Sequence, residues 1–123
     1  MKEIVNDIHS ELIKQLGNFG GYKPIIHGET IVITAHGEVG RSGKITYPAK
    51  IRSGVNVWGD TQYRPQLTPN KFFALVKEAV KIVEAELAIK IKVIPVKEVF
   101  KQGNRHCINC VAKFELNTKV LRS

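Results

Sequence analysis

Apolar residues recur at helical spacing through the stretch from Leu67 to Leu87, LTPNKFFALVKEAVKIVEAEL. Thr68 can cap the first free amides of a helix there, and Pro69 takes the first helical position, where a missing N–H has no cost. Leu67 and Phe72 stand one residue before and four after this cap, the spacing of a hydrophobic staple. The pattern predicts a helix over residues 68–87 with one apolar side, formed by Phe72, Leu75, Val76, Ala79, Val80, Val83 and Leu87.

An N-terminal helix is predicted over residues 2–16, and Gly17 supplies its stop. Its apolar residues again return every three or four positions. The glycine-rich segment that follows is expected to turn and to fold Phe19 and Tyr22 back onto the core. The apolar side of this helix comprises Ile4, Val5, Ile8, Leu12 and Leu16.

Alternation of apolar and polar residues marks the strands. Proline cannot donate to a ladder, so Pro48 is expected at an edge or a bulge, and Pro95 is expected to disturb its ladder. The loop at 101–105 is a plausible hairpin connection. The predicted strands cover residues 24–36 with a break at Gly28, 44–52, 55–58, 89–100 and 106–116.

This order of elements predicts an α+β fold with a mainly antiparallel sheet of five or six strands, because short loops join neighbouring strands. Neither helix is apolar all round, so both are expected to pack on one face of the sheet. The 123 residues fit a single domain, 1–123, that needs no disulfide or metal. No apolar run approaches the roughly 18 residues that span a bilayer. Acidic residues interrupt the start of the chain, so a cytoplasmic protein without membrane contact is expected.

The net charge of +8 is unevenly divided along the chain. Residues 39–59 hold four basic residues and no acidic one, and residues 89–123 hold eight basic and two acidic ones, whereas the two helices carry no basic surplus. With the predicted strand phases, six of these side chains share the uncovered face of the sheet. A solvated surface is one interpretation, and contact with a polyanion or an acidic protein patch is the other. The candidate contact residues are Arg41, Lys44, Lys50, Arg52, Lys90, Lys92 and Lys113.

Two short motifs contain residue types that can bind phosphate or metal. The segment GEVGRSGK departs from a phosphate-binding loop, because five residues separate Gly37 from Gly43 and Ile45 follows Lys44. The segment HCINC holds His106, Cys107 and Cys110, yet zinc usually takes four ligands and no second cysteine pair exists. His27 or His36 could complete a site only by an arrangement that the sequence does not reveal.

In an extended strand the two cysteines point to opposite faces, so Cys110 is expected to be buried and Cys107 half-exposed. A redox Cys-x-x-Cys would normally stand at a helix N-terminus. No catalytic constellation is recognisable among the histidines, serines and acids. We therefore expect no enzymatic activity, no metal, no cofactor and no small-molecule substrate.

Trp58, Tyr63 and Arg64 lie in or beside the segment before the second helix. A tryptophan on a strand is more often part of a core, but an aromatic pair with arginine on a surface loop is also typical of interaction sites. The segment 59–67 and the loop 37–43 are thus candidate protein-contact elements. The predicted basic face displays no aromatics, so stacking on RNA bases is not expected, whereas contact with backbone phosphates stays open.

The chain resembles the small tail-terminator and neck proteins of tailed phages. The resemblance rests on the opening helix at 2–16, the loop GEVGRSGK, the helix at 68–87 and the final hairpin at 89–116. Double-stranded RNA-binding domains share helix, three strands and helix, but of the basic cluster that starts their second helix only Lys71 is present. The phage resemblance implies a homo-oligomeric ring that works by protein–protein contact, in the host cytoplasm or the virion. The alternative function is a nucleic-acid-binding module with little sequence preference.

Overall fold

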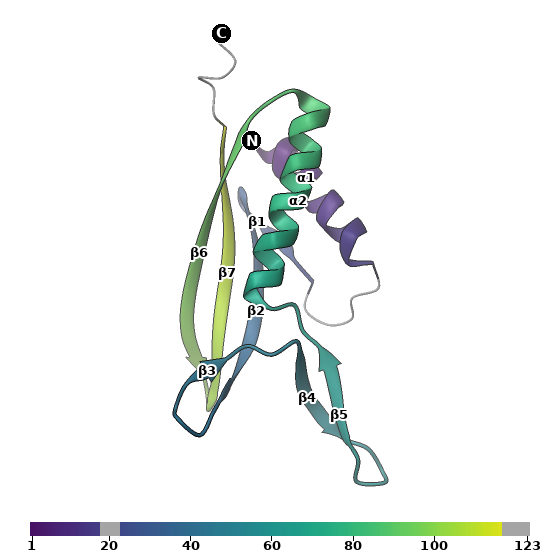
Figure 1. Cartoon of the computed structure of the whole chain (residues 1–123), viewed down its shortest axis with the longest axis vertical. Helices are drawn as coiled ribbons and strands as arrows, with labels where there is room; N and C mark the ends of the chain where they lie inside the picture. The colour runs from purple at the N-terminus through teal and green to yellow at the C-terminus, as the bar shows by residue number, and fades with distance from the viewer. Residues whose placement is uncertain (18–22, 117–123) are drawn as a thin grey trace.

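The computed structural model describes residues 1–17 and 23–116 (Figure 1). Phe19 and Tyr22, predicted to fold onto the core, lie outside these residues. The elements are α1 (Lys2–Leu16), β1 (Ile25–His27), β2 (Thr30–Val39), β3 (Ile45–Thr46), β4 (Lys50–Val55), β5 (Thr61–Pro65), α2 (Pro69–Leu87), β6 (Ile91–Gln102) and β7 (Arg105–Leu116).

Helix α2 begins at a side-chain cap and ends at a residue in the left-handed conformation. The Thr68 hydroxyl accepts from the Lys71 amide at 3.3 Å, as the sequence predicts for its cap. At the other end Ala88 takes the left-handed conformation, with φ 53° and ψ 44°, although it is not a glycine. The Glu84 carboxylate accepts from the Ile91 amide at 2.8 Å and so ties the helix end to β6.

The larger sheet is antiparallel, in the order β1-β2-β7-β6, and β3 pairs with the far end of β2. Its two middle strands come from opposite ends of the chain: Ile33 lies opposite Cys110, and Ala35 opposite Ile108. The segments between them in sequence, including α2, therefore leave the sheet and return to it.

Both helices pack on one face of this sheet, which confirms the predicted fold class (Figure 1). Helix α1 contacts β1 and β2, and α2 contacts β6 and β7. One hydrophobic cluster joins them, because alternate residues of the strands face the apolar sides of the helices. Its most deeply buried members include Val5, Ile8 and Leu12 of α1, Ile31 of β2, Phe72, Val76 and Val83 of α2, and Cys110 and Ala112 of β7.

The hairpin of β6 and β7 is longer than the helix that covers it. Its twelve-residue strands extend roughly 40 Å, whereas the nineteen residues of α2 extend roughly 28 Å. The hairpin therefore continues past the start of α2, toward the turn at Gly103 (Figure 1). Beside this end the chain forms a separate two-stranded sheet from β4 and β5.

Four predictions about strands and loops are wrong. The strand predicted at 44–52 is divided at Pro48 into β3 and β4, and the strand predicted at 55–58 is the end of β4 and a turn. The predicted loop before α2 contains β5. Pro95 does not disturb the ladder, since β6 is an edge strand and pairs continuously with β7 from Ile91 to Gln102.

No helix in residues 1–17 or 23–116 is long and apolar enough to cross a membrane.

Candidate functional site

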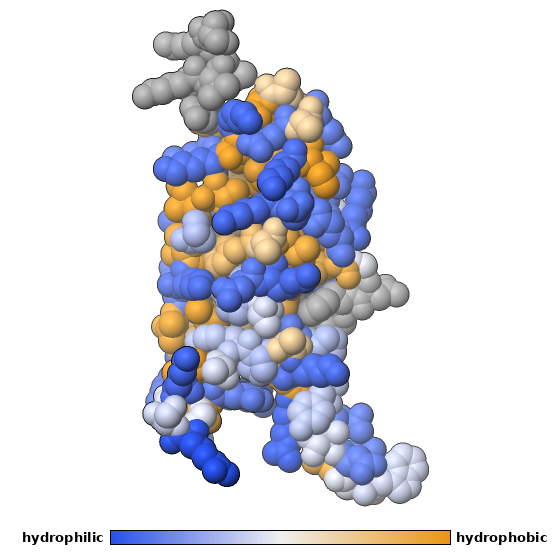
Figure 2. Space-filling model, in the orientation of Figure 1, coloured by the Kyte–Doolittle hydropathy of each residue, from blue (hydrophilic) through white to orange (hydrophobic). Residues whose placement is uncertain are grey.

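Residues 49–66, here called the arm, project from the body as a twisted hairpin (Figures 1 and 2). Its apolar and aromatic residues are exposed rather than packed. Val57 and Trp58 are 89% and 82% exposed, and Val55 and Tyr63 are 58% and 63% exposed. Trp58 is therefore not a core residue, and the interaction-site interpretation of Trp58, Tyr63 and Arg64 stays open. Ile51, near the root of the arm, is buried.

The arm tip, residues 56–60, is fixed by the side chain of Asn56. Its amide oxygen accepts from the backbone amides of Trp58 and Asp60, both at 2.9 Å. The backbone adds bonds from Gly59 N to Asn56 O at 3.1 Å and from Asn56 N to Asp60 O at 3.0 Å. Gly59 has φ 82°, a conformation that glycine adopts without strain. Val57 and Trp58 are thus held outward by a pre-formed turn, so little backbone ordering is required when they bind.

Gln66 fastens the root of the arm to the main sheet. Gln66 is 2% exposed. Its side-chain amide bonds to the backbone N–H and C=O of His36, as the backbone of a neighbouring strand would. Gln66 Oε1 accepts from His36 N at 2.7 Å, and Nε2 donates to His36 O at 3.0 Å and to Pro48 O at 3.0 Å. The backbone N–H of Gln66 also donates to Ala49 O at 2.7 Å. This one side chain therefore satisfies the backbone groups of His36 at the edge of β2, between the pairings of that strand with β1 and β3.

The sheet face opposite the helices, here called the uncovered face, has an apolar centre. In the register Ile25 lies opposite Val32, Val32 opposite Val111, and Val111 opposite Val96. Successive residues of a strand point to opposite faces, and the neighbouring Ile31 and Ala112 are buried against the helices. These four β-branched side chains therefore form one row across all four strands. Ile25 is 59% exposed, and the three valines are partly exposed.

A shallow cavity of about 390 Å³ lies on this row. Ile25, Val32 and Val111 form its apolar part, and Thr30, Glu98, Asn109 and Lys113 are among its polar residues. Within the described residues no helix or strand packs over it. An apolar centre with a polar rim is the usual composition of a protein-binding surface.

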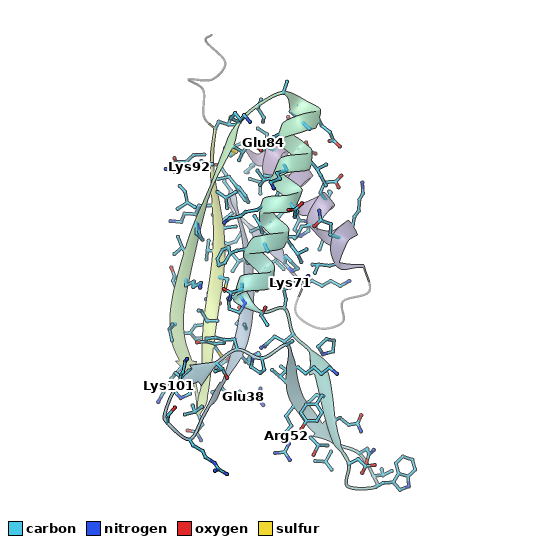
Figure 3. All side chains as sticks on the ribbon, viewed as in Figure 1. Glu38, Arg52, Lys71, Glu84, Lys92 and Lys101 are labelled. Atoms are coloured by element: carbon cyan, nitrogen blue, oxygen red, sulfur yellow. The ribbon has the colours of Figure 1, made fainter. Side chains whose placement is uncertain are left out.

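The prediction that six basic residues share the uncovered face of the sheet is wrong. Of the six residues assigned to it, only Lys92 and Lys113 point to the uncovered face. In the register Lys92 lies opposite Glu115, and Lys113 lies opposite Ile94. Lys44 lies in the loop between β2 and β3, and Lys90 in the connection from α2 to β6. Lys50 and Arg52 belong to the arm, which β-periodicity alone could not separate from the main sheet. Lys92 also lies at the opposite end of the molecule from Arg52 and Lys101 (Figure 3).

Positive charge gathers instead at one end of the molecule. This basic end comprises residues 37–66 and 100–106, which meet where Gly37 lies opposite His106. Seven basic residues and two acidic ones occupy it. They are Arg41, Lys44, Lys50, Arg52, Arg64, Lys101 and Arg105, with Glu38 and Asp60. The loop after β2 and the arm form two projections from this end (Figure 2).

Cys107 is fully buried, so the prediction that it is half-exposed is wrong. It lies on the uncovered side of β7, between His36 and Phe100 of the neighbouring strands, and its Sγ is 3.3 Å from His36 Nδ1. Cys110 is buried against the helices, as predicted. Burial raises the pKa of the Cys110 thiol to about 11, although Lys97 opposes the shift. The pKa of His36 is lowered, first by burial and second by the positive charge of Arg105.

No group of three or more His, Cys, Asp or Glu side chains in the described part of the chain is placed to hold a metal ion. His106, Cys107 and Cys110 do not form such a group, since the two cysteines point to opposite faces of β7.

Sequence reasoning missed three features of the site. Asn56 and Gly59 are turn residues between alternating segments and could have revealed the hairpin. Gln66 carries no sequence signal, because its role depends on the distant His36 and Pro48. Arg105 was assigned to a loop, although it begins β7.

No protein-family model matches this chain, and comparisons with curated proteins and with solved structures give no match either.

Proposed function

We propose that this protein is a non-enzymatic assembly module whose copies associate with one another through the arm. The main support for this proposal is the arm tip, which holds Val57 and Trp58 outward on a hydrogen-bonded turn. Burying one aromatic side chain of roughly 150–250 Å² contributes roughly 4–6 kcal/mol at about 25 cal/mol per Å². A rigid tryptophan is therefore a strong candidate for an interface hot spot.

The counterpart that we propose for the tip is the uncovered face of a neighbouring copy. Its cavity of about 390 Å³ has an apolar part from Ile25, Val32 and Val111. Asn109 and Lys113 at the cavity could meet the polar backbone and Asp60 of the tip. Tip and cavity are different surfaces of one chain, so the contact is heterologous and repeats from copy to copy. Such contacts close into a ring when the rotation between copies permits it.

The setting that we propose is a ring-forming structural protein of a phage neck or tail, present in the host cytoplasm and then the virion. This follows from the resemblance to neck and tail-terminator proteins. The order of elements on which the resemblance rests, helix, strands, helix and closing hairpin, is the order found in the structure.

Replacing Trp58 by alanine is expected to weaken self-association about 30-fold or more, because a buried tryptophan hot spot is worth about 2 kcal/mol or more. Light scattering and sedimentation velocity over a range of protein concentrations measure this. Leu87→Ala is the matched control, since Leu87 is also an exposed apolar residue, 44% exposed, but lies at the end of α2. A wild-type protein that stays monomeric at high concentration in low and moderate salt contradicts the proposal, as does equal association by Trp58→Ala.

A further inference from the structure

Three arginines from three strands contribute to the lining of one cavity at the root of the arm. The cavity measures about 330 Å³ and is lined by Ile51, Arg52, Ser53, Gly54, Arg64 and Arg105. Arg52 belongs to β4, Arg64 to β5 and Arg105 to β7, so the fold brings Arg105 to two arginines that lie more than forty positions before it in the sequence. A smaller cavity of about 220 Å³, which also contains His36 and Glu38, shares Arg52 and Arg105 with it.

The backbone around this cavity is irregular. Arg64 lies opposite Ile51, and Arg52 opposite Tyr63, but Ser53 is an extra residue because the register shifts between Arg52 and Gly54. Bulges of this kind bend a strand and redirect its side chains. Ser53 and Gly54 also leave one wall of the cavity without a bulky side chain.

The three guanidinium groups have no negative partner within the described chain. The ion pairs there join Glu11 to Lys14 and Glu78 to Lys81, within the two helices. None of Arg52, Arg64 and Arg105 makes a side-chain hydrogen bond to a described residue. Glu38 lines the smaller cavity together with Arg52 and Arg105, and it forms no ion pair with an arginine. Three like charges around one open space repel one another unless an anion enters it.

The geometry points to a binding site for the backbone phosphates of a nucleic acid at this three-arginine cavity. Guanidinium groups present paired donors that match phosphate oxygens, and they stay charged at any physiological pH. A single small anion would contact only these three arginines. The basic end adds Arg41, Lys44, Lys50 and Lys101, and such a row of charges suits a polymer with a phosphate at every residue. Phosphate contacts carry no base information, so binding has little sequence preference. This inference does not rest on the proposed self-association.

The test is binding of a fluorescently labelled DNA duplex of random sequence, followed by anisotropy from about 50 to 200 mM salt. Three phosphate contacts contribute about −2.7 to the slope of log K against log salt. The triple variant Arg52→Gln, Arg64→Gln and Arg105→Gln should therefore lose a slope of about 2.7 and bind more than tenfold more weakly. The control triple variant Lys71→Gln, Lys77→Gln and Lys81→Gln removes the same charge from exposed positions of α2 and should retain most of the affinity.

Four results overturn the inference. They are absence of duplex binding by the wild type, equal weakening by the two triple variants, an unchanged salt slope in the arginine variant, and displacement of the duplex by polyglutamate at equal charge concentration. The last result assigns the cavity to an acidic protein instead. If circular dichroism shows that the arginine variant does not fold, Arg105→Gln alone is measured. It should reduce the slope by about 0.9, and an unchanged slope then rejects the site.

Discussion

Cys107 and Cys110 are both fully buried, although their side chains point to opposite faces of β7. Alternation along the strand identifies Cys110 as a core residue, since it falls in step with Ile108 and Ala112. The burial of Cys107 was not predictable in this way. Its cover comes from His36 and Phe100, which lie opposite it in the register and far from it in the sequence.

The two cysteines should differ when each is replaced by serine. A serine at 110 buries a hydroxyl among apolar side chains, which is expected to lower the free energy of unfolding by about 1–3 kcal/mol. A serine at 107 can still hydrogen-bond to His36 Nδ1, which now lies 3.3 Å from Sγ, and should be better tolerated. Urea denaturation of both variants measures the difference. A larger loss for Cys107→Ser than for Cys110→Ser would contradict this interpretation.

At the scale of elements, the helices were predictable and the arm was not. Both helices carry an uninterrupted apolar side and clear end signals, Gly17 for α1 and Thr68 with Pro69 for α2. Residues 44–52 and 55–58 alternate between apolar and polar positions, so periodicity alone predicts two strands of the main sheet there. In the structure the chain breaks at Pro48 and turns at Asn56 and Gly59. Strands β4 and β5 therefore form a second sheet, which tertiary contacts hold to the first.

The attachment of the arm should depend on Gln66. Gln66→Leu leaves His36 N, His36 O and Pro48 O without their present partner, and an unsatisfied buried polar group costs about 1–3 kcal/mol. We expect a loss of stability in this range and faster amide exchange in β4 and β5. Gln62→Leu is the control, because Gln62 is exposed on the same arm. Equal stability of the two variants would show that Gln66 does not hold the arm.

At the scale of the whole molecule, the sequence shows how much charge is present but not where it gathers. The basic residues of 39–59 and of the last hairpin were expected on one sheet face. The fold places Lys92 and Lys113 on that face and the larger group at one end of the molecule (Figure 3). The difference arises because residues 49–66 leave the sheet. The uncovered face is consequently apolar at its centre, and its candidate partner changes from a polyanion to the arm of another copy.

The intrinsic fluorescence of Trp58 tests the proposed association most directly, since this is the only tryptophan in the chain. In the monomer the indole is 82% exposed, so its emission should be that of a solvated tryptophan and acrylamide should quench it strongly. As rising concentration drives association, the emission should shift to shorter wavelength and quenching should fall. Val111→Lys, which places a charge in the proposed cavity and leaves Trp58 unchanged, should suppress both effects. Oligomers in which Trp58 stays fully quenchable would contradict the central claim that the arm tip is buried between copies.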